Sequence, residues 1–109
     1  MAPAELVIEF RDRSGELAAT VTLEERTMFW SEGRFIPGPA FGRHRELFHR
    51  VEAASRQFQA VQAGDRGLEA LELAWRAIND RFDIRERDAE HALTDVGLHL
   101  DGARAALRW

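Results

Sequence analysis

The sequence predicts an α+β fold in which one antiparallel sheet is covered on its apolar face by an antiparallel pair of helices. Two glycine-containing turns, one near each end of the chain, lie between stretches of alternating apolar and polar residues, which is the pattern of a β-hairpin. Between them, residues 41–80 change to a helical period. The expected order is therefore ββ(β)-αα-(β)ββ, with a sheet built from N- and C-terminal hairpins and both helices laid across it.

The C-terminal hairpin is predicted by the Asp101-Gly102 turn within residues 94–109. With this dipeptide as the turn, Leu100 pairs with Ala103 and the pairing continues outward to the chain end. One face then carries Thr94, Val96, Leu98, Leu100, Ala103, Ala105, Leu107 and Trp109. An amphipathic helix through the same residues also fits a helical period, but two glycines and a Thr-Asp-Val run disfavour it.

The N-terminal hairpin is predicted over Leu6–Glu24, with Ser14-Gly15 as its turn and Leu6 opposite Leu23. Its apolar face carries Leu6, Ile8, Phe10, Leu17, Ala19, Val21 and Leu23. The polar faces of the two hairpins are expected to face water, as antiparallel sheets allow. That solvated face would hold Glu9, Arg11, Arg13, Thr20, Thr22, His99, Arg104 and Arg108.

Two amphipathic helices are predicted between the hairpins, over about Phe41–Gln62 and Arg66–Asp80. Gly64-Asp65 ends the first helix and opens the second. The short link predicts that the two helices are antiparallel neighbours.

Two connections allow more than one interpretation. Arg26–Trp30 is expected as a third strand, with Ser31–Gly33 as a turn before Arg34–Ile36. Its bulky residues Phe29, Trp30, Phe35 and Ile36 either pack over the sheet or form a recognition loop. Phe82 to Leu93 is interpreted as a short strand followed by a charged turn. The alternative is a third helix that begins at a capping box formed by Asp83 and Glu86.

Composition narrows the class of protein. The 109 residues are expected to form a single domain, residues 1–109, around one core. Cysteine is absent, so thiol nucleophiles, disulfides and thiolate metal sites are excluded. No apolar stretch is long enough for a membrane span, and no leader pattern is present, so a cytoplasmic location is expected. The net charge of -4 argues against nucleic acid as the partner.

The titratable residues do not predict catalysis or metal binding. His44 and His49 are five positions apart on a helix, which sets them on diverging faces. His91 lies in a charged loop, and His99 is expected to project from a strand into water opposite Arg104. No serine lies in a glycine-rich elbow, and no phosphate-binding glycine loop is present. The sequence therefore predicts a non-enzymatic protein with no cofactor and no metal.

The remaining prediction is a protein-interaction module. Small size, acidic charge and an aromatic connection suit an immunity-type or antitoxin-type bacterial inhibitor, or a regulatory partner, that docks on a basic protein surface. The expected partner-binding residues are Trp30, Glu32, Arg34, Phe35, Asp80, Asp83, Glu86, Asp88, Glu90 and His99. The alternatives are a small-molecule sensor with its ligand between helices and sheet, lined by Trp30, Trp75 or Phe58, and a homodimer with a self-complementary sheet.

Overall fold

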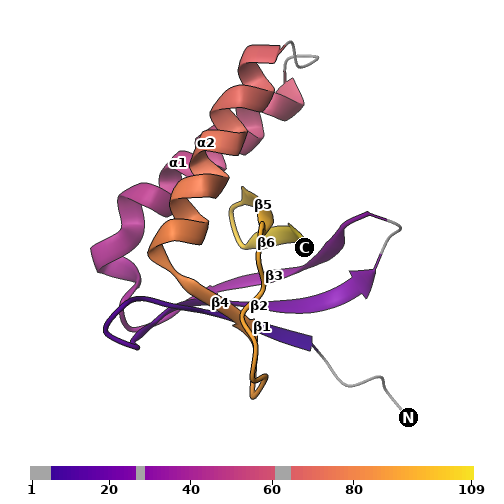
Figure 1. Cartoon of the computed structure of the whole chain (residues 1–109). Coiled ribbons are helices and arrows are strands. Elements are labelled where there is room, and N and C mark those ends of the chain that lie inside the picture. Colours follow the sequence, from indigo (N-terminus) through magenta and orange to yellow (C-terminus); the bar gives the residue numbers. More distant parts are fainter. Residues whose placement is uncertain (1–5, 27–28, 61–64) are drawn as a thin grey trace.

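The computed structural model describes residues 6–26, 29–60 and 65–109, and it contains one sheet with two helices on one face (Figure 1). The sheet has six antiparallel strands in the order β4-β1-β2-β3-β6-β5. This confirms the predicted fold class. The elements in chain order are β1 (Leu6–Arg11), β2 (Leu17–Arg26), β3 (Ser31–Pro37), α1 (Phe41–Ala60), α2 (Asp65–Arg81), β4 (Asp83–Glu86), β5 (Gly97–Asp101) and β6 (Arg104–Arg108).

The core between sheet and helices is centred on Phe48 of α1, which is 1% exposed. Its ring lies 5.3 to 6.1 Å, centroid to centroid, from those of four other phenylalanines. These are Phe10 on β1, Phe35 on β3, Phe41 at the start of α1 and Phe82 before β4. One helical side chain therefore ties three parts of the sheet layer to the helix layer. Neither described helix is both long and apolar enough to cross a bilayer.

The N-terminal hairpin has the predicted register from Leu6, opposite Leu23, to Phe10, opposite Ala19. The predicted two-residue turn is wrong, because a bulge follows Phe10 and the loop covers residues 12–16. Gly15 alone takes the left-handed conformation there, with φ of 84°. A serine in a primed turn would need positive φ, whereas the longer loop requires it only of the glycine.

The C-terminal hairpin is present, but its turn is displaced by one residue to Gly102-Ala103. Gly102 has φ of 60° in the first central position, where a type II′ turn needs a glycine. Leu98 now pairs with Leu107 instead of Ala105. Because the pairing moves by two positions, the predicted faces are kept, and Leu98 and Leu107 remain fully buried.

The structure settles the two connections that allowed more than one interpretation, the residues before β3 and those after Phe82. β2 extends to Arg26 and the third strand is Ser31–Pro37, so the predicted strand at Arg26–Trp30 and the turn at Ser31–Gly33 are wrong in their bounds. Thr27 and Met28 of that prediction lie outside the described residues, as does Gln62, the predicted end of the first helix. After Phe82 the preferred strand interpretation is confirmed, since Asp83–Glu86 pairs with β1.

Both edge strands of the sheet accept hydrogen bonds from other parts of the chain or donate them, which hinders strand addition by another chain. On the outer edge of β5, Trp75 Nε1 donates to Leu98 O at 2.7 Å, and Ser55 Oγ accepts from Leu100 N at 3.3 Å. Just before β5, Asn79 makes two hydrogen bonds of 2.9 Å with the backbone of Val96. On β4, Ile84 O accepts from Leu93 N at 2.7 Å. The helices therefore complete the sheet with side chains as well as covering it.

The polar face of the sheet is less solvated than predicted. Thr20 and Thr22 on β2 are only 8% and 6% exposed. The register places Thr20 between Glu9 and Ile36, and larger side chains likewise flank Thr22. Small residues on a central strand are therefore shielded by their neighbours on both sides, which the pattern of a single hairpin does not reveal.

Candidate functional site

The antiparallel register gathers the chain's connections at two opposite ends of the sheet. The aromatic end is formed by the β2–β3 connection, the β4–β5 connection and the residue after β6. The cleft end is formed by the β1–β2 loop, the start of α1 and the end of α2 (Figure 1). Each end carries a different candidate site.

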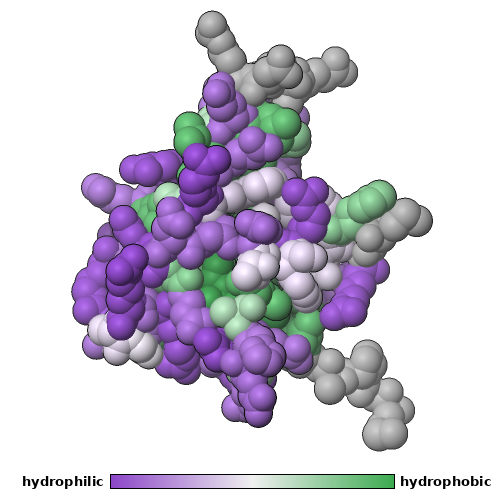
Figure 2. Space-filling view, viewed as in Figure 1, coloured by the Kyte–Doolittle hydropathy of each residue, from purple (hydrophilic) through white to green (hydrophobic). Residues whose placement is uncertain are grey.

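The aromatic end exposes large apolar side chains. Phe29 is 70% exposed and Trp109 is 46% exposed. The ladder between β3 and β6 ends where Ser31 pairs with Leu107, so the two residues before Ser31 and the two after Leu107 lie at the same end of the sheet. The guanidinium of Arg108 lies 5.1 Å from the Trp30 ring centroid, in agreement with that placement. Phe29, Trp30 and Trp109 are called the aromatic patch. Figure 2 shows an apolar projection at the β2–β3 connection.

His99 lies inside a ring cluster next to this patch, so the prediction that it projects into water opposite Arg104 is wrong. It pairs with Ala106, and its ring centroid lies 4.6 Å from Trp30, 5.7 Å from Trp75 and 6.0 Å from Phe58. The curl of the sheet brings β5 under the helices, so both faces of this strand are packed. Burial, and then the charge of Arg108, lower the pKa of His99.

The lowered pKa gives a pH prediction for His99→Gln. The unfolded chain takes up a proton on this histidine near pH 6.5, before the folded chain does. The contribution of His99 to folding stability is therefore fully present above that pH. It is lost as the pH falls toward the lower pKa that His99 has in the folded chain. We expect chemical denaturation to show that the free energy of unfolding falls less between pH 7.5 and pH 5 in His99→Gln than in the unmodified chain. The difference should be less than about 1 kcal/mol, because the ring is partly solvated. An unchanged or steeper loss would contradict the burial of His99.

Acidic side chains follow β4 at the same end of the sheet. Glu86, Asp88 and Glu90 are exposed, and none takes part in an ion pair with another residue that the structure describes. They are called the acidic segment. Arg85 binds Asp83 at 2.7 Å and also donates to the backbone oxygens of Ala89 and Glu90 at 3.3 and 3.1 Å. Arg87 binds Glu9 at 3.3 Å. Both arginines therefore pair with carboxylates outside the segment, and the three carboxylates of the segment face solvent.

The other predicted partner-binding residues are scattered. Glu32 is exposed on β3, where it lines a hollow of about 160 Å³ with His99, and Arg34 is paired with Glu24 at 2.8 Å. Phe35 is 9% exposed and belongs to the core. Asp80 is exposed at the end of α2, on the wall of the cleft. Of the predicted set, the residues toward the aromatic end are Trp30, Glu32, Glu86, Asp88, Glu90 and His99, whereas Asp83 pairs with Arg11 toward the cleft end.

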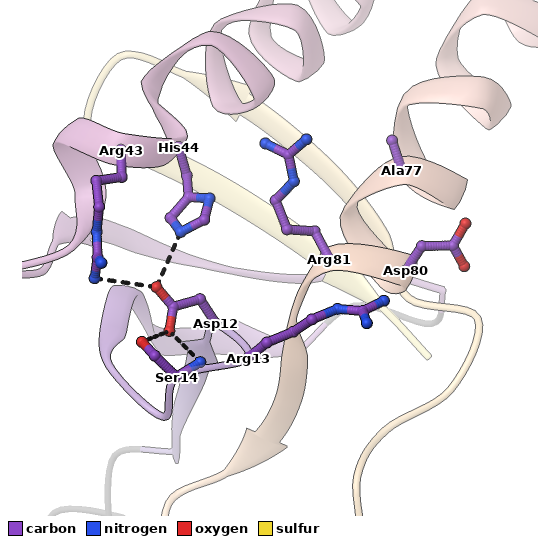
Figure 3. A pocket seen from close by; sticks show the side chains of 8 residues that line it. All are labelled: Asp12, Arg13, Ser14, Arg43, His44, Ala77, Asp80 and Arg81. Atoms are coloured by element: carbon purple, nitrogen blue, oxygen red, sulfur yellow. Dashed lines mark hydrogen bonds and ion pairs between the residues drawn. The ribbon is translucent and has the colours of Figure 1, made fainter.

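The cleft end holds a depression of about 580 Å³ (Figure 3). It is called the arginine cleft, and its lining is Asp12, Arg13, Ser14, Arg43, His44, Ala77, Asp80 and Arg81. The β1–β2 loop supplies the floor, the first turn of α1 one wall and the last turns of α2 the other.

Asp12 fastens the β1–β2 loop to α1. Its Oδ1 accepts hydrogen bonds from the hydroxyl and backbone N–H of Ser14 and from Glu16 N, at 2.5 to 3.1 Å. Its Oδ2 lies 3.2 Å from Arg43 Nη2 and 3.1 Å from His44 Nε2. The Ser14 hydroxyl, followed by the His44 ring, holds the pKa of the Asp12 carboxyl well below its usual range.

This arrangement does not have the order of a hydrolytic triad. A triad needs the histidine between the nucleophile and the carboxylate, so that the ring takes the hydroxyl proton. Here Asp12 lies between Ser14 and His44, and the hydroxyl donates to the carboxylate. Ser14 is therefore a loop-fixing residue. Among the described residues, no group of three or more histidine, aspartate or glutamate side chains is arranged to hold a metal ion.

Comparisons with protein-family models, with curated proteins and with solved structures give no match. The functional assignment therefore depends on the geometry alone. Sequence reasoning missed the exposure of Trp109 and the whole arginine cleft. The cleft brings together Arg13 and Arg81, which are far apart in the sequence. The polar loop around Ser14-Gly15 was the only feature of the local sequence that pointed to this site.

Proposed function

We propose that this chain is a non-enzymatic protein-interaction module, and that it docks on its partner through the aromatic patch and the acidic segment. The observation that supports this most strongly is the exposure of Phe29 and Trp109 beside the half-buried Trp30. Large aromatic side chains dominate the binding energy of protein interfaces. Leaving them in water is unfavourable unless a partner covers them.

The acidic segment indicates the charge of the partner. Three strand spacings of about 4.8 Å, roughly 14 Å, separate β4 from β3 across the sheet. Along the strands, Glu86 is level with Phe35, five residues from Trp30, which adds roughly 16 Å. The two features are therefore roughly 22 Å apart and fit within one interface that buries about 800 Å² per partner. Glu86, Asp88 and Glu90 would steer a basic surface toward the chain, and the aromatic patch would anchor it. A toxin or effector with a basic surface, inhibited in a bacterial cytoplasm by an immunity-type or antitoxin-type partner, has this chemistry.

Docking through side chains is favoured over strand addition. The outer edge of β5 is bonded to Ser55 and Trp75, and Ile84 O on β4 is bonded to Leu93 N. A partner strand would have to displace these bonds before it could pair. The alternative of a small-molecule sensor requires a ligand pocket between Trp30, Trp75 and Phe58. The His99 ring fills that space, so this alternative has less support.

The test is quantitative affinity capture from the native host with matched variants of the tagged chain. We expect Phe29→Ala with Trp109→Ala to reduce recovery of the specific partner at least about tenfold, because each anchor contributes about 1–2 kcal/mol or more. Reversal of the acidic segment with Glu86→Lys, Asp88→Lys and Glu90→Lys should reduce recovery most strongly at low salt.

Matched controls lie on the outer face of α2. Leu73→Ala removes an apolar side chain that is 57% exposed, and Glu69→Lys with Glu72→Lys reverses exposed acids on the same helix. Both controls should leave recovery unchanged. Equal recovery by every variant, or no specific protein at any salt concentration, would contradict the proposal. Light scattering of the purified chain separates a homodimer, the other candidate occupant of this surface, from a monomer awaiting its partner.

A further inference from the structure

The arginine cleft gathers three arginines in a chain that is negative overall. Its lining contains three arginines and two aspartates, whereas the whole chain has a net charge of -4. The charge of Arg43 is already shared between Asp12 and Glu16. The side chains of Arg13 and Arg81, in contrast, make no hydrogen bond or ion pair with any residue in the described part of the chain. Two guanidinium groups in one concavity are thus left available.

These two arginines come from different elements, one from the floor of the cleft and one from its α2 wall. Arg13 belongs to the β1–β2 loop, and Arg81 is the last residue of α2. Figure 3 shows Arg81 reaching from α2 toward α1, to the level of His44, while Arg13 runs along the floor toward Asp80. The loop that carries Arg13 is held in place by the hydrogen bonds of Asp12. One side of the site is therefore positioned before any ligand arrives.

A buried nitrogen in the same place has no partner. His44 is hydrogen-bonded to Asp12 through Nε2, and its Nδ1 is buried without a hydrogen bond. Buried polar atoms are nearly always paired, so a nitrogen without a partner beside a cleft is consistent with a site that water or another molecule completes. This atom is independent of the charge argument and lies on the α1 wall of the same cleft.

We propose that the arginine cleft binds a small molecule carrying a doubly charged oxyanion, either a phosphate or a pair of carboxylates. Guanidinium groups bind such oxyanions through paired, charge-assisted hydrogen bonds. A volume of about 580 Å³ is larger than a bare phosphate requires and lies in the range of small-ligand sites. Asp80, next to Arg81 on the α2 wall, would accept a hydrogen bond from a hydroxyl or amino group of the same ligand. The cleft lies at the other end of the sheet from the docking surface, so the two sites are independent.

The test is calorimetric titration of the purified chain with inorganic pyrophosphate and, separately, with malonate, against chloride at matched ionic strength. We expect saturable binding of at least one probe, with movement of the His44 ring signals in NMR spectra. Arg13→Gln and Arg81→Gln should each weaken binding about tenfold or more, since each removes a charged hydrogen-bond donor. Arg76→Gln, an exposed arginine on α2 outside the cleft, is the matched control and should bind as the unmodified chain does.

The outcomes separate the two oxyanion sources. Saturation by pyrophosphate alone assigns a phosphorylated ligand, and saturation by malonate alone assigns a dicarboxylate. No saturable binding of either probe up to about 10 mM would overturn the proposal. An equal weakening by Arg76→Gln would overturn it as well, because binding would then depend on overall charge. Neither cleft variant alters the aromatic patch or the acidic segment, so protein capture tests the docking proposal separately.

Discussion

Gly33→Ala is expected to destabilise the protein by about 3 kcal/mol or more, because β3 has no room for a side-chain carbon there. A Cβ built on Gly33 would lie 1.9 Å from Thr22 O and 2.8 Å from Leu23 Cα. Both are backbone atoms of the neighbouring strand, and the pairing is irregular just after Leu23. A flexible side chain could move aside, but here the strands themselves must separate. Thermal or urea denaturation followed by circular dichroism measures the loss.

Gly42→Ala is the matched control, since it is the same substitution in a different setting. No atom outside the helix lies within 4 Å of a Cβ at Gly42, which is in the first turn of α1. Alanine loses less conformational entropy in a helix, so this variant should be about 0.5–1 kcal/mol more stable than the unmodified chain. Equal stability of the two variants would show that the close approach of β2 and β3 is absent in solution.

Phe48→Ala is expected to cost about 3–5 kcal/mol, because it removes the ring that contacts four other phenylalanines. Phe48 is 1% exposed, and the cavity it would leave lies where helix and sheet meet. Phe29→Ala deletes the same group from a position that is 70% exposed and should change stability by less than about 0.5 kcal/mol. Urea denaturation of both variants measures the difference. Similar losses would mean that Phe48 is not the centre of the core.

The fold class could be predicted because its evidence is local. Alternation around Ser14-Gly15 and around Gly102, and the helical period between them, each depend on residues close in the chain. The turns themselves were less predictable. A shift of two in the pairing of Leu98 keeps every side chain on its face, so hydrophobic patterning alone cannot distinguish the two registers.

The candidate sites depend on pairings between distant parts of the chain. Nothing local indicates that β3 pairs with β6, yet this pairing places Trp109 beside the β2–β3 connection. The curl that buries His99 arises from the contact of β5 with both helices, including the bond from Trp75 to Leu98. The acidic segment was predictable, because its three carboxylates fall within five residues of the chain and all are exposed.

The docking surface is tested most directly by hydroxyl-radical footprinting of the chain with and without the partner recovered from the host. We expect bound partner to protect Phe29 and Trp109 from oxidation, while Leu73 on α2 is labelled equally in both states. Protection of Leu73, with Phe29 and Trp109 still labelled, would place the partner on the helices and contradict the proposed surface.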